Sequence, residues 1–524
     1  MVHDLLTQVS PHYFMEDLLQ LPRSSGVLLH ITCLPGPHGS GDFGASAYAF
    51  VDWLVKARQR LWQVLPLTSI GLGNSPYVGS SAFAGNPLLI DLDALQTSGW
   101  LPDEDDPTDC LSREFEEGRV NFDVVVPYRM SRLRSAWQGF RQQATAPQLE
   151  ALAAFCQRES FWIDDYALFM SLQEHYATDS WLAWPRALAD RQPAALEQAR
   201  ALHADRIDFW CFCQWCFCTQ WLKLKRYANQ RDVNIIGDLP MFVGHESADV
   251  WAHPALFDLD ETGRNRTVAG APPDAFSDEG QRWGAPLYCW AAHARDDFQW
   301  WVRRFRSARE VADIVRIDHF RGLIAFWEVP AEAASGRGGR WRRAPGTALL
   351  DAVVAALGPL HAIAEEPDIF IADVDALRRQ LALPGTRILQ LAFRTDERAD
   401  DSAGNSILLP HRHEQDIVLY TGTHDTNTAC GWWAEASEAE RERARHYLRI
   451  DTNEIHWELI RVASASVANT AIHPLQDVLG VGAEARMNRP GRPDGNWRWR
   501  FKQDELLPWH AQRLAALTGL YERG

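Results

Sequence analysis

The 524-residue sequence lacks the features of several large functional classes. It has no run of about 18 apolar residues, the length that a membrane-spanning helix needs. Residues 1–20 contain acids and no long apolar stretch, so we expect no secretory signal peptide. Extended basic runs are absent and the formal net charge is −17, so neither nucleic acid nor a membrane is an expected partner. No Gly-Lys-Ser/Thr phosphate loop and no His-x-x-x-His metal spacing occurs.

Cysteine is sparse and unevenly spread, with nine residues in the chain. An odd, irregular set favours a reduced cytoplasm over a secreted disulfide framework. Cys211, Cys213, Cys216 and Cys218 do fall close together, which suggests a metal site. On a helix, however, Cys213 and Cys216 share one face while Cys211 and Cys218 share another, so the four sulfurs cannot close a tetrahedron. The interleaved aromatic residues indicate a buried helix, and we expect no metal.

Acidic side chains follow three apolar strands at the points where those strands end. Val315–Ile317 leads into Asp318, Leu360–Ala364 into Glu365, and Ile417–Thr423 into His424 and Asp425. In a barrel of parallel strands the carboxyl ends face one side, where active sites lie, so the three acids can converge. Glycoside chemistry needs such a set, because one carboxylate attacks the anomeric carbon and one acid protonates the leaving oxygen. Taken alone, Asp318 could equally be a structural partner of a neighbouring arginine.

The strand pattern predicts one (β/α)8 barrel, an α/β fold, as a single catalytic domain over residues 1–524. Apolar runs of strand length lie near residues 28, 64, 238, 315, 363, 390, 419 and 472, the sixth being Ile388–Phe393. Residues 100–230 carry helical patterns and are predicted to form a mostly helical insertion. Residues 244–300 are rich in glycine, proline and aromatic residues, which predicts a loop insertion that covers the substrate.

Three motifs, in this order along the chain, resemble those of a known enzyme family. Val315–Gly322, Ala364-Glu365 and Tyr420–Asp425 are similar to the catalytic motifs of the 4-α-glucanotransferases. These are the amylomaltases, or disproportionating enzymes, of glycoside hydrolase family 77 in the α-amylase clan. The likeness runs from about residue 23 to 501 and is less specific between about 100 and 205. It implies a retaining transferase that acts on α-1,4-glucans without a cofactor or metal.

The resemblance also implies a role for each acid. Asp318 would be the nucleophile, Glu365 the general acid/base, and Asp425 the group that binds sugar hydroxyls beside the reacting carbon. Arg316 shares a strand face with Asp318 and would balance its negative charge. Glu365 must be protonated at the first step, so its pKa should be raised by burial or by a neighbouring acid. Glu366 points to the opposite strand face, which predicts a structural role.

Substrate contacts are predicted for residues on the strand ends and loops around these acids. The Ser75–Tyr77 stretch resembles the substrate-lining loop of the family, and Arg486–Gly491 resembles its closing loop. The predicted set is Ser75, Tyr77, Asp238, Asp249, Trp283, Arg316, His319, His424, Asn488 and Pro490. The expected donors are maltooligosaccharides and α-1,4-glucans, and the expected acceptor is glucose or a second glucan.

Two other functions stay open at this point: an α-glucan hydrolase of the same clan, and a catalytically idle glucan-binding protein. The presence of all three acids argues against the idle protein, and Ala269–Asp274 resembles transferases more than amylases. The sequence departs from the family pattern at Ala275, at Glu366-Pro367-Asp368 and at Thr426-Asn427. These departures bear on acceptor preference, and an aromatic residue at position 275 would offer an arriving glucan a stacking face.

Overall fold

Eight parallel strands form the central sheet of the protein. The computed structural model describes residues 21–102, 115–273, 277–366, 372–395, 408–450, 454–492 and 494–524. The strand order is β10-β11-β12-β1-β2-β3-β6-β9, which is chain order around a ring. At the junction of β9 and β10 the Ala364 N–H donates to the Pro384 carbonyl at 2.9 Å. The sheet is therefore a nearly closed (β/α)8 barrel, as the sequence predicts. Its strands are β1 (Ser24–Leu28), β2 (Leu61–Gln63), β3 (Asn234–Leu239), β6 (Ile314–Ile317), β9 (Ala362–Ala364), β10 (Gly385–Ile388), β11 (Ile417–Tyr420) and β12 (Thr470–Pro474).

The barrel strands are short apolar runs that end in polar residues. All four residues of β6 are buried, as expected for a strand covered on both faces. One predicted strand is misplaced, because only the first residue of Ile388–Phe393 is extended. The strand β10 comes earlier, at Gly385–Ile388, and Leu389–Phe393 forms a 3-10 helix. A short apolar run does not distinguish a strand from a helical turn by periodicity, which explains the error.

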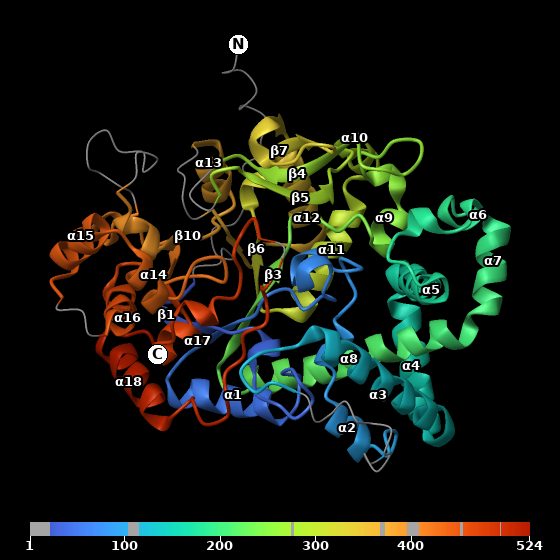
Figure 1. Cartoon of the computed structure of the whole chain (residues 1–524), viewed down its shortest axis with the longest axis horizontal. Coiled ribbons are helices and arrows are strands. Elements are labelled where there is room, and N and C mark those ends of the chain that lie inside the picture. Colours follow the sequence, from blue (N-terminus) through green and yellow to red (C-terminus); the bar gives the residue numbers. More distant parts are fainter. Residues whose placement is uncertain are drawn as a thin grey trace.

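Helices pack around the outside of the barrel (Figure 1). Helix α8 contacts α1 and α11, α11 contacts α12, and α18 contacts both α1 and α16. The helices of this layer and of the segments between strands are α1 (Ala45–Lys56), α2 (Leu92–Thr97), α8 (Ala204–Asn229), α11 (Gln299–Val311), α12 (Gly346–Leu357), α13 (Ala372–Gln380), α14 (Ala429–Glu435), α15 (Glu438–Leu448), α16 (Ile455–Ala465), α17 (Leu475–Leu479) and α18 (Pro508–Leu520). None of the helices in the described ranges is long and apolar enough to cross a membrane.

A group of helices between β2 and β3 extends to one side of the barrel, on the right in Figure 1. It comprises α3 (Phe122–Gln143), α4 (Ala146–Arg158), α5 (Ser160–Tyr176), α6 (Arg186–Ala189) and α7 (Pro193–Leu202). Helix α8 joins the group to the barrel, because it contacts α3, α4 and α5 as well as β3. Cys211, Cys213 and Cys216 of α8 are buried among aromatic residues. That residues 100–230 form a separate insertion in the barrel stays a prediction.

A second, antiparallel sheet accompanies the barrel and was not predicted. Its strands are β4 (Thr267–Ala271), β5 (Gln281–Pro286), β7 (Ala325–Pro330) and β8 (Arg340–Arg343), in the order β5-β4-β7-β8. β4 and β5, with the short helices α9 (Ala248–Ala252) and α10 (Trp290–His293), lie within the predicted loop insertion of residues 244–300. Figure 1 shows β4, β5 and β7 together at the top of the view. The insertion is thus partly regular structure and is tied to the segment that follows β6.

Two arginines hold the C-terminal end of α16. Arg523 is fully buried and donates to the carbonyls of Ala463 (3.2 Å), Ser464 (2.6 Å), Ser466 (3.0 Å) and Ala468 (2.8 Å). Arg23 donates to Ser464 and Ser466 as well, at 3.2 and 3.0 Å. The last carbonyls of a helix lack partners within the helix and carry partial negative charge. The two guanidinium groups supply those partners. Burial lowers the pKa of Arg523 to about 9.

Candidate active site

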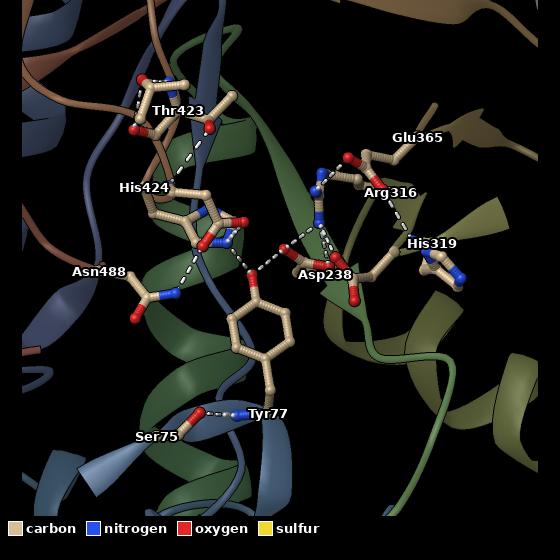
Figure 2. A network of polar contacts seen from close by, with 12 residues as sticks. Ser75, Tyr77, Asp238, Arg316, His319, Glu365, Thr423, His424 and Asn488 are labelled. Atoms are coloured by element: carbon tan, nitrogen blue, oxygen red, sulfur yellow. Dashed lines mark hydrogen bonds and ion pairs between the residues drawn. The ribbon is translucent and has the colours of Figure 1, made fainter. Parts of the chain in front are cut away.

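The site is built around the buried guanidinium of Arg316, which projects from β6 (Figure 2). Its Nη1 donates to both carboxylate oxygens of Asp238 at 2.8 and 2.7 Å, and to Asp318 Oδ1 at 2.9 Å. Its Nη2 lies 3.5 Å from Glu365 Oε1. Asp238, Arg316 and Glu365 come from the neighbouring strands β3, β6 and β9 or the residues just after them, which the parallel register places side by side. One cation therefore gathers three acids at one end of the barrel.

Exposure separates the carboxylates that a ligand can reach from the one that it cannot. The side chains of Asp318, Glu365 and Asp425 are 24%, 19% and 34% exposed, whereas that of Asp238 is 0% exposed. Both oxygens of Asp238 are also occupied by Arg316. Asp238 therefore orients Arg316, and its predicted contact with the sugar stays a prediction.

Glu365 follows β9 and is held by the turn after β6. Its Oε2 accepts the His319 N–H at 2.8 Å. His319 adopts a left-handed conformation, with φ of 49°, and this turns the chain away from the strand directly after Asp318. Burial raises the pKa of Glu365 to about 7, and the negative charges of Asp318 and Asp425 act in the same direction against Arg316. Glu365 can therefore hold a proton near neutral pH, as a general acid must.

Asp425 has the opposite electrostatic environment. Burial alone would raise its pKa, but His424 and the amide of Asn488 bring it down to about 2. The Asn488 Nδ2 donates to Asp425 Oδ1 at 2.6 Å, and His424 Nε2 lies 3.2 Å from Asp425 Oδ2. For His424, burial acts to lower the pKa, yet the Asp425 charge raises it overall. The pair therefore places an ionised carboxylate on the opposite side of the site from Glu365.

Tyr77 connects the two halves of the site. Its hydroxyl donates to Asp238 Oδ2 at 2.8 Å and lies 2.9 Å from His424 Nε2, and its ring stacks on His424 with centroids 5.3 Å apart. Ser75 caps the turn that carries Tyr77, since its Oγ accepts the Tyr77 N–H at 3.2 Å. Figure 2 shows the tyrosine hydroxyl pointing to the space between Asp238 and His424. Burial, followed by the charge of Asp238, raises the pKa of Tyr77 well above its usual range, so the hydroxyl keeps its proton.

Trp283 and His319, the residue after Asp318, form an aromatic pair at the site. Their rings pack edge to face, with centroids 5.0 Å apart and an interplanar angle of 88°. Burial lowers the pKa of His319 to about 4, so its imidazole is neutral. Within the described residues its Nε2 has no hydrogen-bond partner. An unpartnered buried polar atom in the residue that follows Asp318 is a candidate partner for a sugar hydroxyl.

Comparison of the chain with known proteins identifies its family. The model of the 4-alpha-glucanotransferases, glycoside hydrolase family 77, matches residues 29–505. The chain belongs to this family.

Relatives match it over nearly their whole length. A 4-alpha-glucanotransferase of Thermus thermophilus is 44% identical over 96% of this chain and 100% of its own, and one of Synechocystis is 43% identical over 96% and 98%. The solved structure of an amylomaltase from Streptococcus agalactiae in complex with acarbose has a TM-score of 0.90 at 36% identity, over 96% and 100% of the two chains.

Asp249 and Pro490, which are among the predicted contact residues, lie outside the network of polar contacts around Arg316. Asp249, in α9, is buried, and its Oδ2 accepts the Ala82 N–H at 2.7 Å, so it holds the loop after Tyr77. Pro490 is partly exposed in the turn after Asn488. Glu366 is separate from Glu365, because its Oε1 lies 3.9 Å from Arg321 Nη1 instead of near Arg316. Ala275, Pro367 and Asp368 lie outside the described residues.

Several residues that support the site were not singled out from the sequence. Trp497 packs against both Tyr77 and His424, with ring centroids 5.8 Å apart in each case. Arg486 donates to the Asp425 carbonyl and so fixes the closing loop on this acid. Arg486 lies in the loop that the family resemblance marks, but Trp497 comes from a segment without a motif. No group of three or more His, Cys, Asp or Glu side chains suited to a metal ion occurs in the part of the chain that the structure describes.

Proposed function

We propose that the three reachable acids carry out a 4-α-glucanotransferase reaction with retention of anomeric configuration. The observation that carries this proposal is the shared guanidinium of Arg316, which holds Asp318 and Glu365 in one small space, where burial raises the pKa of Glu365 to about 7. A retaining enzyme needs two such carboxyl groups close together, one ionised and one protonated. The family membership of the chain supplies the substrate class.

In the first step Asp318 attacks the anomeric carbon of a bound α-1,4-glucan. The bond from that carbon to the glycosidic oxygen breaks, and Glu365 gives its proton to the leaving oxygen. The fragment with the new 4-hydroxyl departs, and the rest of the donor stays as an ester on Asp318. The ionised Asp425 accepts hydrogen bonds from hydroxyls next to the reacting carbon, and His319 and Trp283 contact the same sugar.

In the second step the 4-hydroxyl of an acceptor, glucose or a glucan, replaces the departed fragment. It attacks the anomeric carbon, its proton passes to Glu365, and the ester bond breaks to restore the Asp318 carboxylate. Maltooligosaccharides and α-1,4-glucans are the proposed donors. The Streptococcus agalactiae amylomaltase was solved with acarbose, and we propose that this chain binds that compound in the same place. A cytoplasmic location is part of the proposal, since the eight cysteines in the described ranges are all unpaired.

Incubation of the purified protein with maltotriose tests the reaction. Transfer gives free glucose and a ladder of longer maltodextrins, while the number of reducing ends stays constant because each transfer conserves them. A steady rise in reducing ends without longer products would identify a hydrolase. Binding of maltotriose without any product would identify a glucan-binding protein. Asp318→Asn provides the matched control, since it should bind the sugar and give no product.

A further inference from the structure

A small cavity borders His30 and His424. It has a volume of about 20 Å³ and is lined by residues from the ends of β1 and β12, from the segments after β1, β2 and β11, from α17 and from the closing loop. Its walls are mainly apolar, but His30, His424, Thr423 and Gln476 also face it. A water molecule needs about 10–15 Å³ and two to four polar partners. The cavity is therefore large enough and polar enough for one water molecule.

Each of the two histidines that line this cavity has one ring nitrogen without a partner. His30 and His424 are both buried, and within the described residues their Nδ1 atoms make no hydrogen bond. His30 follows β1 and His424 follows β11, and the two strands lie on either side of β12. Buried polar atoms without a partner are rare, because each costs the free energy of its lost hydration. A single molecule between the two rings would give both nitrogens a partner.

We propose that this cavity binds one water molecule that bridges Nδ1 of His30 and Nδ1 of His424, and that His30 is thereby a positioning residue for the His424–Asp425 pair. The bridge acts inside the site described above, so its effect on turnover rests on the proposed function. The presence of the bridging water does not depend on that function.

The contacts of His424 decide how the hydrogens are arranged. The Tyr77 hydroxyl donates to Asp238, so its oxygen accepts from His424 Nε2. Asp425 Oδ2, on the same nitrogen, also only accepts. Nε2 therefore carries a hydrogen in both states of His424. The ring becomes positively charged when Nδ1 gains a proton and neutral when Nδ1 loses it. When Nδ1 is protonated, it donates to the water, and the water donates to His30.

His30 is suited to accept this hydrogen bond. Burial, and then the charge of His424, lowers the pKa of His30 to about 3, so its ring stays neutral. The other charged groups that act on His424 are Asp425, Asp238 and Arg316. Cys33 also lines the cavity, but burial raises the pKa of its thiol to about 12 and leaves it uncharged. His30 is thus the group at the cavity that supports a protonated His424, and with it the ion pair to Asp425.

A crystal structure of the full chain that shows ordered water tests the bridge directly, whether or not the protein transfers glucans. We expect one water molecule within hydrogen-bond distance of both Nδ1 atoms. A cavity without density, or a His30 ring turned so that Nδ1 faces elsewhere, would refute the proposal.

The effect on His424 is tested by NMR titration of protein labelled with ¹⁵N at histidine, with the His424 signal assigned from its absence in His424→Gln. His30→Phe should lower the titration midpoint of His424 by about one pH unit, because the charged form loses its acceptor. It should also lower kcat/KM about tenfold at a pH where His424 is protonated in the wild type. His30→Gln keeps an acceptor and should restore most of both quantities.

Leu28→Ile is the matched control, since Leu28 lines the same cavity without a polar group. It should leave the His424 titration unchanged. An unaltered midpoint in His30→Phe, or an equal shift in Leu28→Ile, would show that the imidazole of His30 does not act on His424. If His30→Phe fails to fold, His30→Gln with the water seen on its side-chain oxygen supports the bridge, and His30→Gln without that water refutes it.

Discussion

Glu365→Gln should yield a protein that is inactive yet more stable above neutral pH than the wild type. The folded protein holds the pKa of Glu365 at about 7, against an ordinary 4.5. Between these two values the folded state binds the proton and the unfolded state does not, so stability falls as the pH rises through this window. Each pH unit is worth ~1.4 kcal/mol, and the ionisation of buried Glu365 therefore opposes folding by about 3 kcal/mol at pH 8.

Urea unfolding at pH 4.5 and at pH 8 measures this effect. A glutamine carries no charge at either pH, so the wild type should lose about 3 kcal/mol relative to Glu365→Gln between the two conditions. Turnover of maltotriose should be lost in the variant at both pH values, because the proton donor is gone. In the wild type, kcat/KM should fall about fivefold from pH 7 to pH 8 as Glu365 loses its proton. A stability difference that does not change with pH would refute the assignment of a raised pKa to Glu365.

Three further predictions concern single side chains. Asp318→Asn should abolish turnover, whereas Glu366→Gln should retain much of it because Glu366 faces Arg321; equal losses in initial rates would contradict this assignment. Tyr77→Phe should lower kcat/KM about tenfold, because Asp238 and His424 lose a shared hydroxyl, and an unchanged rate in a folded variant would mean that the two halves of the site act independently. Arg523→Met should lower the free energy of unfolding by about 3 kcal/mol, since the carbonyls at the end of α16 lose their donors. The control Arg513→Met breaks a surface pair with Glu454 and should cost below about 1 kcal/mol, so similar losses in the two variants would argue against the arginine cap of α16.

The barrel could be predicted because its strands combine two local signals. Runs such as Ile314–Ile317 are apolar on both faces, and a polar residue follows each run where the strand opens into the site. Both signals are encoded within a few residues. The 3-10 helix at Leu389–Phe393 shows the limit of this approach, since its composition is that of a buried strand and only its neighbours decide the backbone.

The antiparallel sheet and the supporting contacts of the site could not be predicted in the same way. Strand β8 reads Arg-Trp-Arg-Arg with every residue exposed, so it carries no apolar alternation, and only pairing with β7 defines it. The commitment of Asp238 to Arg316 and Tyr77 depends on three segments meeting in space, and so does the approach of His30 to His424. Sequence motifs identify the acids of the site, but the direction of each side chain depends on packing between distant segments.

The single guanidinium at the centre of the site has a consequence for the electrostatic potential there. With Glu365 protonated, the carboxylates of Asp238, Asp318 and Asp425 outnumber Arg316 and His424, so the site keeps an excess of at least one negative charge. A neutral glucan gains little from this excess. As the glycosidic bond breaks, however, positive charge develops at the anomeric carbon and is attracted to the surrounding carboxylates. The excess negative charge therefore stabilises the transition state more than the bound donor. A reaction is accelerated by this difference in stabilisation. In the proposed mechanism, ester formation removes the charge of Asp318, while Glu365 becomes negative as it gives up its proton. The negative charge thus moves from Asp318 to Glu365, which can then accept the proton of the arriving acceptor.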